Sequence, residues 1–171
     1  LFPHAIAQGS TFNPGLIERM TEAAGAEAAT MGIHQVLSPV FDIARELRWG
    51  RVEETYGEDP YLIAEMGIGF VKGYQKHRIT CTPKHFVAHG TPTGGLNCAF
   101  VSGGEREFRS MHLYPFARVI KEADPLCIMS CYSAYDGIPV SASPYYMTDV
   151  LRDELGFKGY VYSDWGSVDR V

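Results

Sequence analysis

The stretch "SPYYMTDVLRDELGFKGYVYSDW" at residues 143–165 holds one complete unit of the fold that we predict. A Ser-Pro pair begins a helix and Gly156 ends it, because proline suits the first helical turn and glycine its end. An apolar run then leads into Asp164 and Trp165. The stretch is therefore predicted to be a helix followed by a buried strand that carries an aspartate at its carboxyl end.

The same order of helix and strand recurs three times upstream. Apolar residues at helical spacing indicate the helices, and we expect Pro115 to bend the third of them. The strands are apolar throughout instead of alternating, which is typical of a parallel sheet covered by helices. The upstream helices are predicted at residues 14–31, 59–75 and 104–123, and the upstream strands at residues 33–43, 79–87 and 126–132.

Two architectures fit this order, the (β/α)8 barrel and the open doubly wound sheet. Every predicted strand delivers polar residues at its carboxyl end, as in a barrel. The only near match to a phosphate-binding loop, "GIGFVKG" at residues 67–73, lies inside a predicted helix, where small residues favour close packing. A full barrel needs about 250 residues and eight strands. We therefore expect a partial (β/α)8 barrel, truncated at both ends, with residues 1–171 as a single segment and no second domain.

Composition excludes several classes of protein. The chain has 171 residues, of which 46% are hydrophobic and 20% charged, and a net charge of −5 that argues against a nucleic-acid surface. No apolar run approaches the roughly 18 residues of a membrane span, and the first residues do not resemble a signal peptide. The four cysteines lack zinc-site spacing, so buried free thiols are expected.

Three groups of polar residues are candidates for a site, each with an alternative. Arg51, in "RWGRVEETYGEDPYL" at residues 48–62, belongs either to an ion-paired loop or to a ligand site. Lys84 and His85 point to opposite faces of a regular strand, so both reach one ligand only if the backbone is distorted. Otherwise they are a solvated lysine and a packed histidine.

The aspartate at the end of the chain has two interpretations as well. Asp164 is either the cap of the next helix or a catalytic carboxylate, and the neighbouring Trp165 suits stacking on a sugar ring. His85 and His89 are four residues apart, a spacing that binds metal on a helix. Here the spacing begins at a strand end, so we expect no metal site.

Several motifs in order along the chain resemble those of glycoside hydrolase family 3, the exo-acting β-glucosidases and β-xylosidases. They are "RWGRVEETYGEDPYL", "PKHFVAHG", "ERE" with "LYPF", and the segment from "IMSCY" to "GYVYSDW". The resemblance covers essentially the whole chain. It implies that the chain is part of the family's N-terminal barrel domain and acts in a retaining glycosidase.

The resemblance also implies a role for each matching residue. Asp164 corresponds to the catalytic nucleophile. Cis peptide bonds are implied around Lys-His-Phe, which would resolve the opposite facing of Lys84 and His85. The residues implied to bind the terminal sugar or line its subsite are Arg51, Lys84, His85, Met129, Tyr132 and Trp165.

Other parts of the catalytic apparatus are implied to lie outside these residues. The acid/base glutamate would come from a following α/β sandwich domain, and a sugar-binding aspartate would precede residue 2. The segment alone should therefore catalyse nothing. The resemblance implies a β-linked oligosaccharide or glycoside as substrate, no metal or other cofactor, and a secreted or periplasmic location.

Three alternatives remain open at this point. One is a non-catalytic carbohydrate-binding barrel in which Arg51, Lys84 and Asp164 only hold sugar. Another is the β-N-acetylglucosaminidase branch of the same family, although "TPTGGLNCAF" lacks the aspartate and histidine of that branch. The third is a metal-dependent hydrolase that uses His85 and His89.

Overall fold

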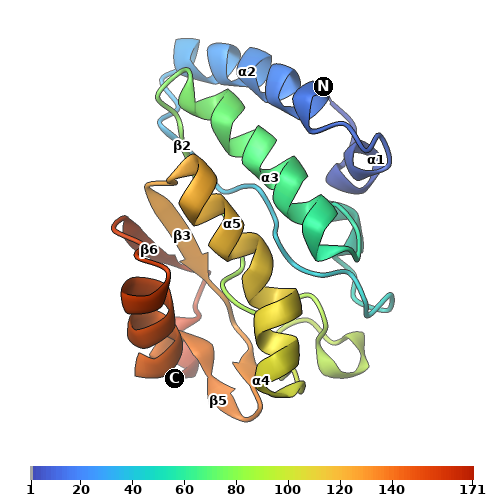
Figure 1. The fold of residues 1–171 in the computed structure, drawn as a ribbon, viewed down its shortest axis with the longest axis vertical. Helices are drawn as coiled ribbons and strands as arrows, with labels where there is room; N and C mark the ends of the chain where they lie inside the picture. The colour runs from blue at the N-terminus through green and yellow to red at the C-terminus, as the bar shows by residue number, and fades with distance from the viewer. Residues whose placement is uncertain (1) are drawn as a thin grey trace.

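The computed structural model describes residues 2–171, in which helices and strands alternate along the chain (Figure 1). The predicted helices and strand segments are present in the predicted order. The helices are α1 (Ala5–Gly9), α2 (Pro14–Thr30), α3 (Pro60–Gln75), α4 (Gly104–Glu107) and α5 (Tyr114–Ala123), with π-helical segments at Phe108–Leu113 and Tyr145–Glu154 and 3-10 turns at Val52–Glu54, Thr93–Gly95, Val140–Ala142 and Val168–Arg170. The strands are β1 (Gln35–Val36), β2 (Thr80–Cys81), β3 (Cys127–Ser130), β4 (Ala134–Tyr135), β5 (Ile138–Pro139) and β6 (Tyr160–Ser163).

The four predicted strand segments lie side by side in the order in which they occur in the sequence. β1 pairs with β2, and β3 pairs with β6, both in parallel. Single parallel bridges from Val40 to Lys84 and from Phe86 to Ser130 join the first segment to the second and the second to the third. Regular pairing in the first segment is short, because Pro39 has no N–H to donate.

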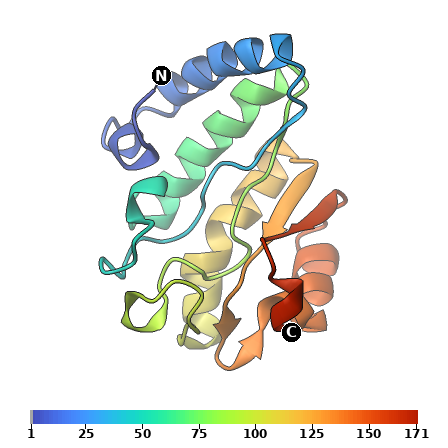
Figure 2. The same ribbon diagram turned by 180° about the vertical axis from the view of Figure 1, so that it is seen from behind.

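All the longer helices cover one face of these strands. Seen from behind, the strand segments lie in front of α3 and α5, and α2 lies beside α3 (Figure 2). Phe116 of α5 packs on that face, with its ring centroid 5.3 Å from that of Phe41 and 5.2 Å from that of Phe86. Sequential parallel strands with helices on one face belong to a (β/α)8 barrel, whereas a doubly wound sheet has helices on both faces. The predicted partial barrel is confirmed.

The third predicted helix is continuous but becomes π-helical in the turns before Pro115. The helix begins as α4, continues through the π-helical segment Phe108–Leu113 and ends as α5. Because Pro115 lacks an N–H, the regular hydrogen bond to the carbonyl four residues earlier cannot form. The fourth predicted helix is present but is also π-helical, and the N–H of Leu155 donates to the carbonyl of Val150, five residues back.

Glycines allow α3 to lie close to its neighbours, in agreement with the packing role predicted for residues 67–73. A Cβ added to Gly69 would lie 2.7 Å from the carbonyl oxygen of Pro14 at the start of α2. A Cβ added to Gly67 would collide with the ring of Phe41. These positions therefore hold α3 between α2 and the strands.

β6 differs from the buried strand predicted at this position. Tyr160 and Tyr162 are 46% and 44% exposed. Within residues 2–171, β6 has a strand partner only on the side of β3, so its outer edge is uncovered. The hairpin formed by β4 and β5 was not predicted either; it turns at Asp136 and Gly137, which both have positive φ.

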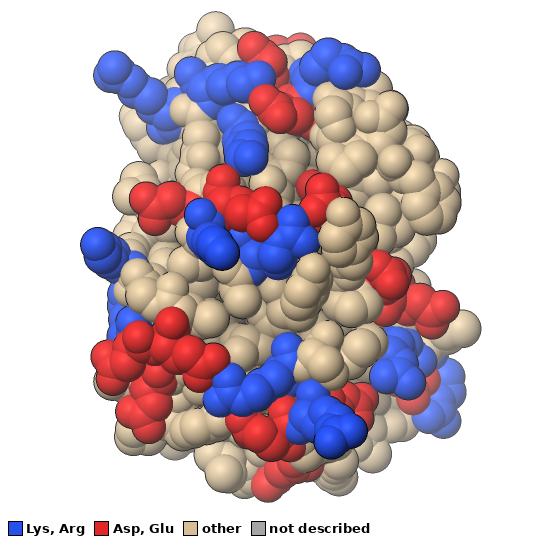
Figure 3. Space-filling model, in the orientation of Figure 1, with Lys and Arg blue, Asp and Glu red and all other residues tan. Residues whose placement is uncertain are grey.

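The surface formed by the helices carries both signs of charge. Figure 3 shows lysine and arginine side chains mixed with aspartate and glutamate side chains on this face. Arg118, for example, contacts both Glu65 and Glu122. No helix within residues 2–171 combines the length and apolar character needed to cross a membrane.

The cysteines agree with the prediction of free thiols. Three of them, Cys81, Cys127 and Cys131, are buried, and Cys98 is half-buried. Burial raises the pKa of Cys131 to about 12. Such thiols are unreactive at neutral pH and act as small apolar side chains.

Candidate active site

Three of the predicted site residues meet where the strand segments end. His85 lies between the other two, with its Nε2 atom 3.1 Å from Nη2 of Arg51 and 3.4 Å from Oδ2 of Asp164. Arg51 comes from the loop after β1, His85 follows β2, and Asp164 follows β6. The parallel order of the strands thus brings together residues up to 113 positions apart.

The side chain of Asp164 is held by the backbone of the next residue, and Asp164 is not a helix cap. Its Oδ1 accepts a hydrogen bond of 2.7 Å from the N–H of Trp165. The turn that follows begins after Ser167, whose side chain makes no capping bond. Oδ2 of Asp164 is buried and has no hydrogen-bond partner among residues 2–171, although the side chain as a whole is 14% exposed. The carboxylate is therefore oriented through one oxygen only.

Asp42 holds His85 through Nδ1, the ring nitrogen that does not face Arg51 and Asp164. Its Nδ1 lies 2.6 Å from Oδ2 of Asp42, and the same oxygen lies 3.4 Å from its backbone nitrogen. Both side chains are 1% exposed. Burial opposes ionisation of Asp42, but its close contact with His85 outweighs the burial and holds the pKa of the Asp42 carboxyl below its ordinary value.

Arg51 is held in the site by a two-point ion pair. Its Nε and Nη2 atoms donate to the two oxygens of Glu54 at 2.7 and 2.9 Å. The 3-10 turn Val52–Glu54 produces this pair, because it brings residues three apart to the same side. Burial opposes the charged forms, yet the pair raises the pKa of Arg51 and lowers that of Glu54. Arg51 is therefore ion-paired, as one of the two alternatives predicted, and the same guanidinium also contacts His85.

Lys84 precedes His85, and the peptide bond between them is cis, as is that between Phe86 and Val87. This confirms the cis peptides implied around Lys-His-Phe. Burial, followed by the charge of Arg51, lowers the pKa of Lys84, and nearby carboxylates oppose the shift. Lys84 and His85 thus take part in one charged cluster, contrary to the alternative of a solvated lysine.

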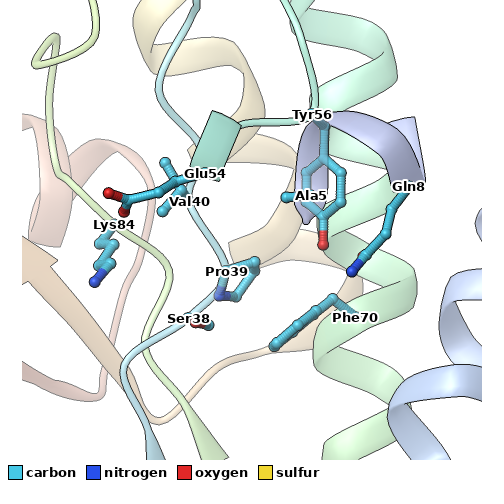
Figure 4. A pocket seen from close by; sticks show the side chains of 9 residues that line it. All are labelled: Ala5, Gln8, Ser38, Pro39, Val40, Glu54, Tyr56, Phe70 and Lys84. Carbon is cyan, nitrogen blue, oxygen red and sulfur yellow. The ribbon is translucent and has the colours of Figure 1, made fainter. Parts of the chain in front are cut away.

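A small pocket lies on the α1 side of this cluster. It has a volume of about 230 Å³, and Figure 4 shows Lys84 and Glu54 at one side of it. Gln8, Tyr56 and Phe70 form the opposite side. The pocket therefore extends the site from its charged centre toward a wall of aromatic rings and an amide side chain.

A larger pocket lies beside Asp164. It has a volume of about 550 Å³ and is lined by Asp164, Trp165 and Met129, together with β6 and Leu37. Met129 is buried, whereas Trp165 is 90% exposed, so the indole is available to contact a ligand. Three of the predicted site residues therefore share one cavity.

The ring of Tyr132 lies beside that of the buried His89. The ring centroids of Tyr132 and His89 are 5.9 Å apart. The His89 ring also lies near two other rings, with centroid distances of 4.7 Å to His85 and 5.4 Å to Trp49. Burial lowers the pKa of His89 to about 4, so this ring is neutral at pH 7. Within residues 2–171, no group of three or more His, Cys, Asp or Glu side chains is arranged to hold a metal ion.

Two residues of the cluster were not predicted from the sequence as parts of the site. Asp42 is the one carboxylate in the apolar stretch "PVFDI" at residues 39–43, and that contrast was the available signal. Glu54 is one of several acidic residues in the loop at residues 48–62, and the sequence did not single it out as the partner of Arg51. Both act by holding another side chain in place.

Comparison with families and curated proteins gives a consistent result. The model described as "Glycosyl hydrolase family 3 N terminal domain" matches residues 1–171. A β-xylosidase of Formosa agariphila is 37% identical to the chain over 180 residues, which cover 100% of the chain and 25% of that protein. A β-glucosidase of Rhizobium radiobacter is 38% identical and matches 96% of the chain and 20% of its own length.

Solved structures agree with these relatives. A β-glucosidase from Erythrobacter marinus superposes with a TM-score of 0.96 at 38% identity, over 99% of the chain and 23% of that structure. A β-glucosidase from Listeria innocua gives a TM-score of 0.95 at 35% identity, over 99% and 24%. The chain thus spans about a quarter of the length of the proteins that it matches.

Proposed function

The chain belongs to glycosyl hydrolase family 3, and on that premise we propose that the protein of which it forms part is a retaining exo-β-glycosidase. We further propose that it removes terminal β-linked glucose or xylose and that Asp164 is its nucleophile. The observation that carries the proposal is the place of Asp164, beside a pocket of about 550 Å³ and within 3.4 Å of the buried His85.

The proposed reaction has two steps. The Asp164 carboxylate attacks the anomeric carbon as the bond to the leaving oxygen breaks, and an acid gives that oxygen a proton. Water then attacks the same carbon and gives a proton to the deprotonated acid, which now acts as a base; the bond to Asp164 breaks, and both carboxyl groups return to their starting forms. Because each step inverts the anomeric carbon, the product keeps the β configuration.

The charged cluster supports a carboxylate that acts as a nucleophile. Arg51 and Lys84 place positive charge near Asp164, which complements the negative charge of a carboxylate nucleophile. Their N–H groups, together with His85, are suited to hydrogen-bond the hydroxyls of a sugar. Trp165 offers an exposed ring for the apolar face of the sugar.

The acid is proposed to come from outside these residues. The two other carboxylates of the cluster, Asp42 and Glu54, both have lowered pKa values and are bound to His85 and Arg51. Ionised carboxylates have no proton to give at neutral pH. We propose an acid/base glutamate in a C-terminal α/β sandwich domain, with residues 1–171 as one segment of the N-terminal catalytic barrel.

Kinetics of the parent enzyme test this proposal. Asp164→Ala should lower turnover of aryl β-glucosides and β-xylosides by a factor on the order of 10⁴ or more. Asp169→Ala is the matched control, because Asp169 is an exposed carboxylate on the next turn, and it should leave turnover unchanged. Retention of turnover by Asp164→Ala would instead favour a barrel in which this residue only binds sugar.

A further inference from the structure

Asp42 is a buried carboxylate that does not face the larger pocket. Its side chain is 1% exposed, and one of its oxygens contacts both Nδ1 and the backbone nitrogen of His85. The other oxygen, Oδ1, is buried without a hydrogen-bond partner among residues 2–171. A buried charge of this kind is costly unless it serves a partner, and the partner here is His85.

The two neighbours of His85 determine which ring nitrogen carries the proton. An arginine side chain only donates hydrogen bonds, so the 3.1 Å contact from Nη2 of Arg51 requires a lone pair on Nε2. An ionised carboxylate only accepts, so the 2.6 Å contact with Asp42 requires a proton on Nδ1. Both contacts are satisfied by the neutral ring protonated on Nδ1 and by no other form.

We propose that Asp42 is a positioning residue that keeps His85 in the Nδ1-protonated form, so that no proton on Nε2 engages Asp164. The separation between Nε2 of His85 and Oδ2 of Asp164 is 3.4 Å. A proton on Nε2 would lie between these atoms and bind the nucleophile. Without it, the carboxylate keeps its charge for the anomeric carbon. This inference rests on the proposed function of Asp164.

The form of the ring can be measured without any change to Asp42. Nitrogen-15 NMR of the ¹⁵N-histidine-labelled parent enzyme distinguishes a protonated ring nitrogen from one with a lone pair, and the signals missing from His85→Gln identify His85. We expect a proton on Nδ1 and a lone pair on Nε2. A proton on Nε2, in the neutral ring or in the doubly protonated one, would overturn the proposal. This result does not depend on whether the enzyme hydrolyses glycosides.

The kinetic consequence is tested with Asp42→Asn, because an amide can also donate to Nδ1 and so favour the other form of the ring. We expect kcat/KM for aryl β-glycosides to fall by about 10- to 100-fold. Most of that loss should be in kcat, since the change acts on the nucleophile. In an enzyme that already carries His85→Ala, the same substitution should have no further effect.

A matched control separates positioning from general destabilisation. Asp136 accepts backbone hydrogen bonds from Gly103 and Gly104 at the start of α4, away from the cluster, and Asp136→Asn should leave kcat and KM unchanged. An equal loss from Asp42→Asn with and without His85 would show that Asp42 does not act through that ring. An inactive wild-type enzyme would contradict the proposed function and leave the NMR result standing.

Discussion

Removal of the Glu54 carboxylate should weaken substrate binding by releasing Arg51. Glu54 accepts two charge-assisted hydrogen bonds from the guanidinium, at 2.7 and 2.9 Å. The Arg51 and Glu54 side chains are 24% and 37% exposed, so solvent screens the pair and we take about 1–2 kcal/mol for its loss, below the value for a buried pair. This free energy corresponds to an increase of about 5- to 30-fold in KM.

The assay compares Glu54→Ala with Glu53→Ala in the parent enzyme. Glu53 is the neighbouring residue on the same turn, is 64% exposed and has only a 3.8 Å contact with His4. We expect KM for an aryl β-glucoside to rise in Glu54→Ala and to stay at the wild-type value in Glu53→Ala. An unchanged KM in Glu54→Ala, or equal increases in both variants, would refute the role given to the ion pair.

Two further predictions concern stability. Gly69→Ala should destabilise the domain by about 1–3 kcal/mol, because the added Cβ would lie 2.7 Å from the carbonyl oxygen of Pro14. Gly15→Ala is the control and should leave stability unchanged, because its Cβ would meet no atom closer than 3.6 Å. Equal unfolding midpoints for the two variants would contradict this prediction. Burial lowers the pKa of His112 from 6.5 to about 4. As the pH falls below 6.5, this histidine therefore takes up a proton in the unfolded chain but not in the folded one. The free energy of unfolding should then decrease by up to about 1.4 kcal/mol per pH unit between pH 6.5 and pH 4. His112→Phe should be less sensitive over that interval, and an unchanged dependence of the unfolding midpoint on pH would show that His112 is not the source.

Much of the fold was predictable because it follows from local signals. Proline and glycine marked the helix ends, and Pro115 marked the π-helical turns before α5. The Asp136-Gly137 pair was an equally clear hairpin signal that the prediction passed over. The exposure of Tyr160 and Tyr162 was not predictable in this way, because the composition of a strand does not determine what covers its edge.

The candidate site shows the same division between local and long-range information. The strand-end motifs identified Arg51, Lys84, His85 and Asp164, and the structure places all of them in one cluster. The contact between Asp42 and His85 joins residues 43 positions apart in two different strand segments. It depends on how those segments align, and a single sequence does not give that alignment.

The most direct test of the account is to trap the covalent intermediate. A 2-deoxy-2-fluoro β-glycoside with a good leaving group should inactivate the parent enzyme, since the fluorine slows release of the glycosyl-enzyme. Proteolysis and mass spectrometry should then find one added sugar on the peptide that contains Asp164. A sugar on any other carboxylate would contradict the assignment of Asp164 as the nucleophile.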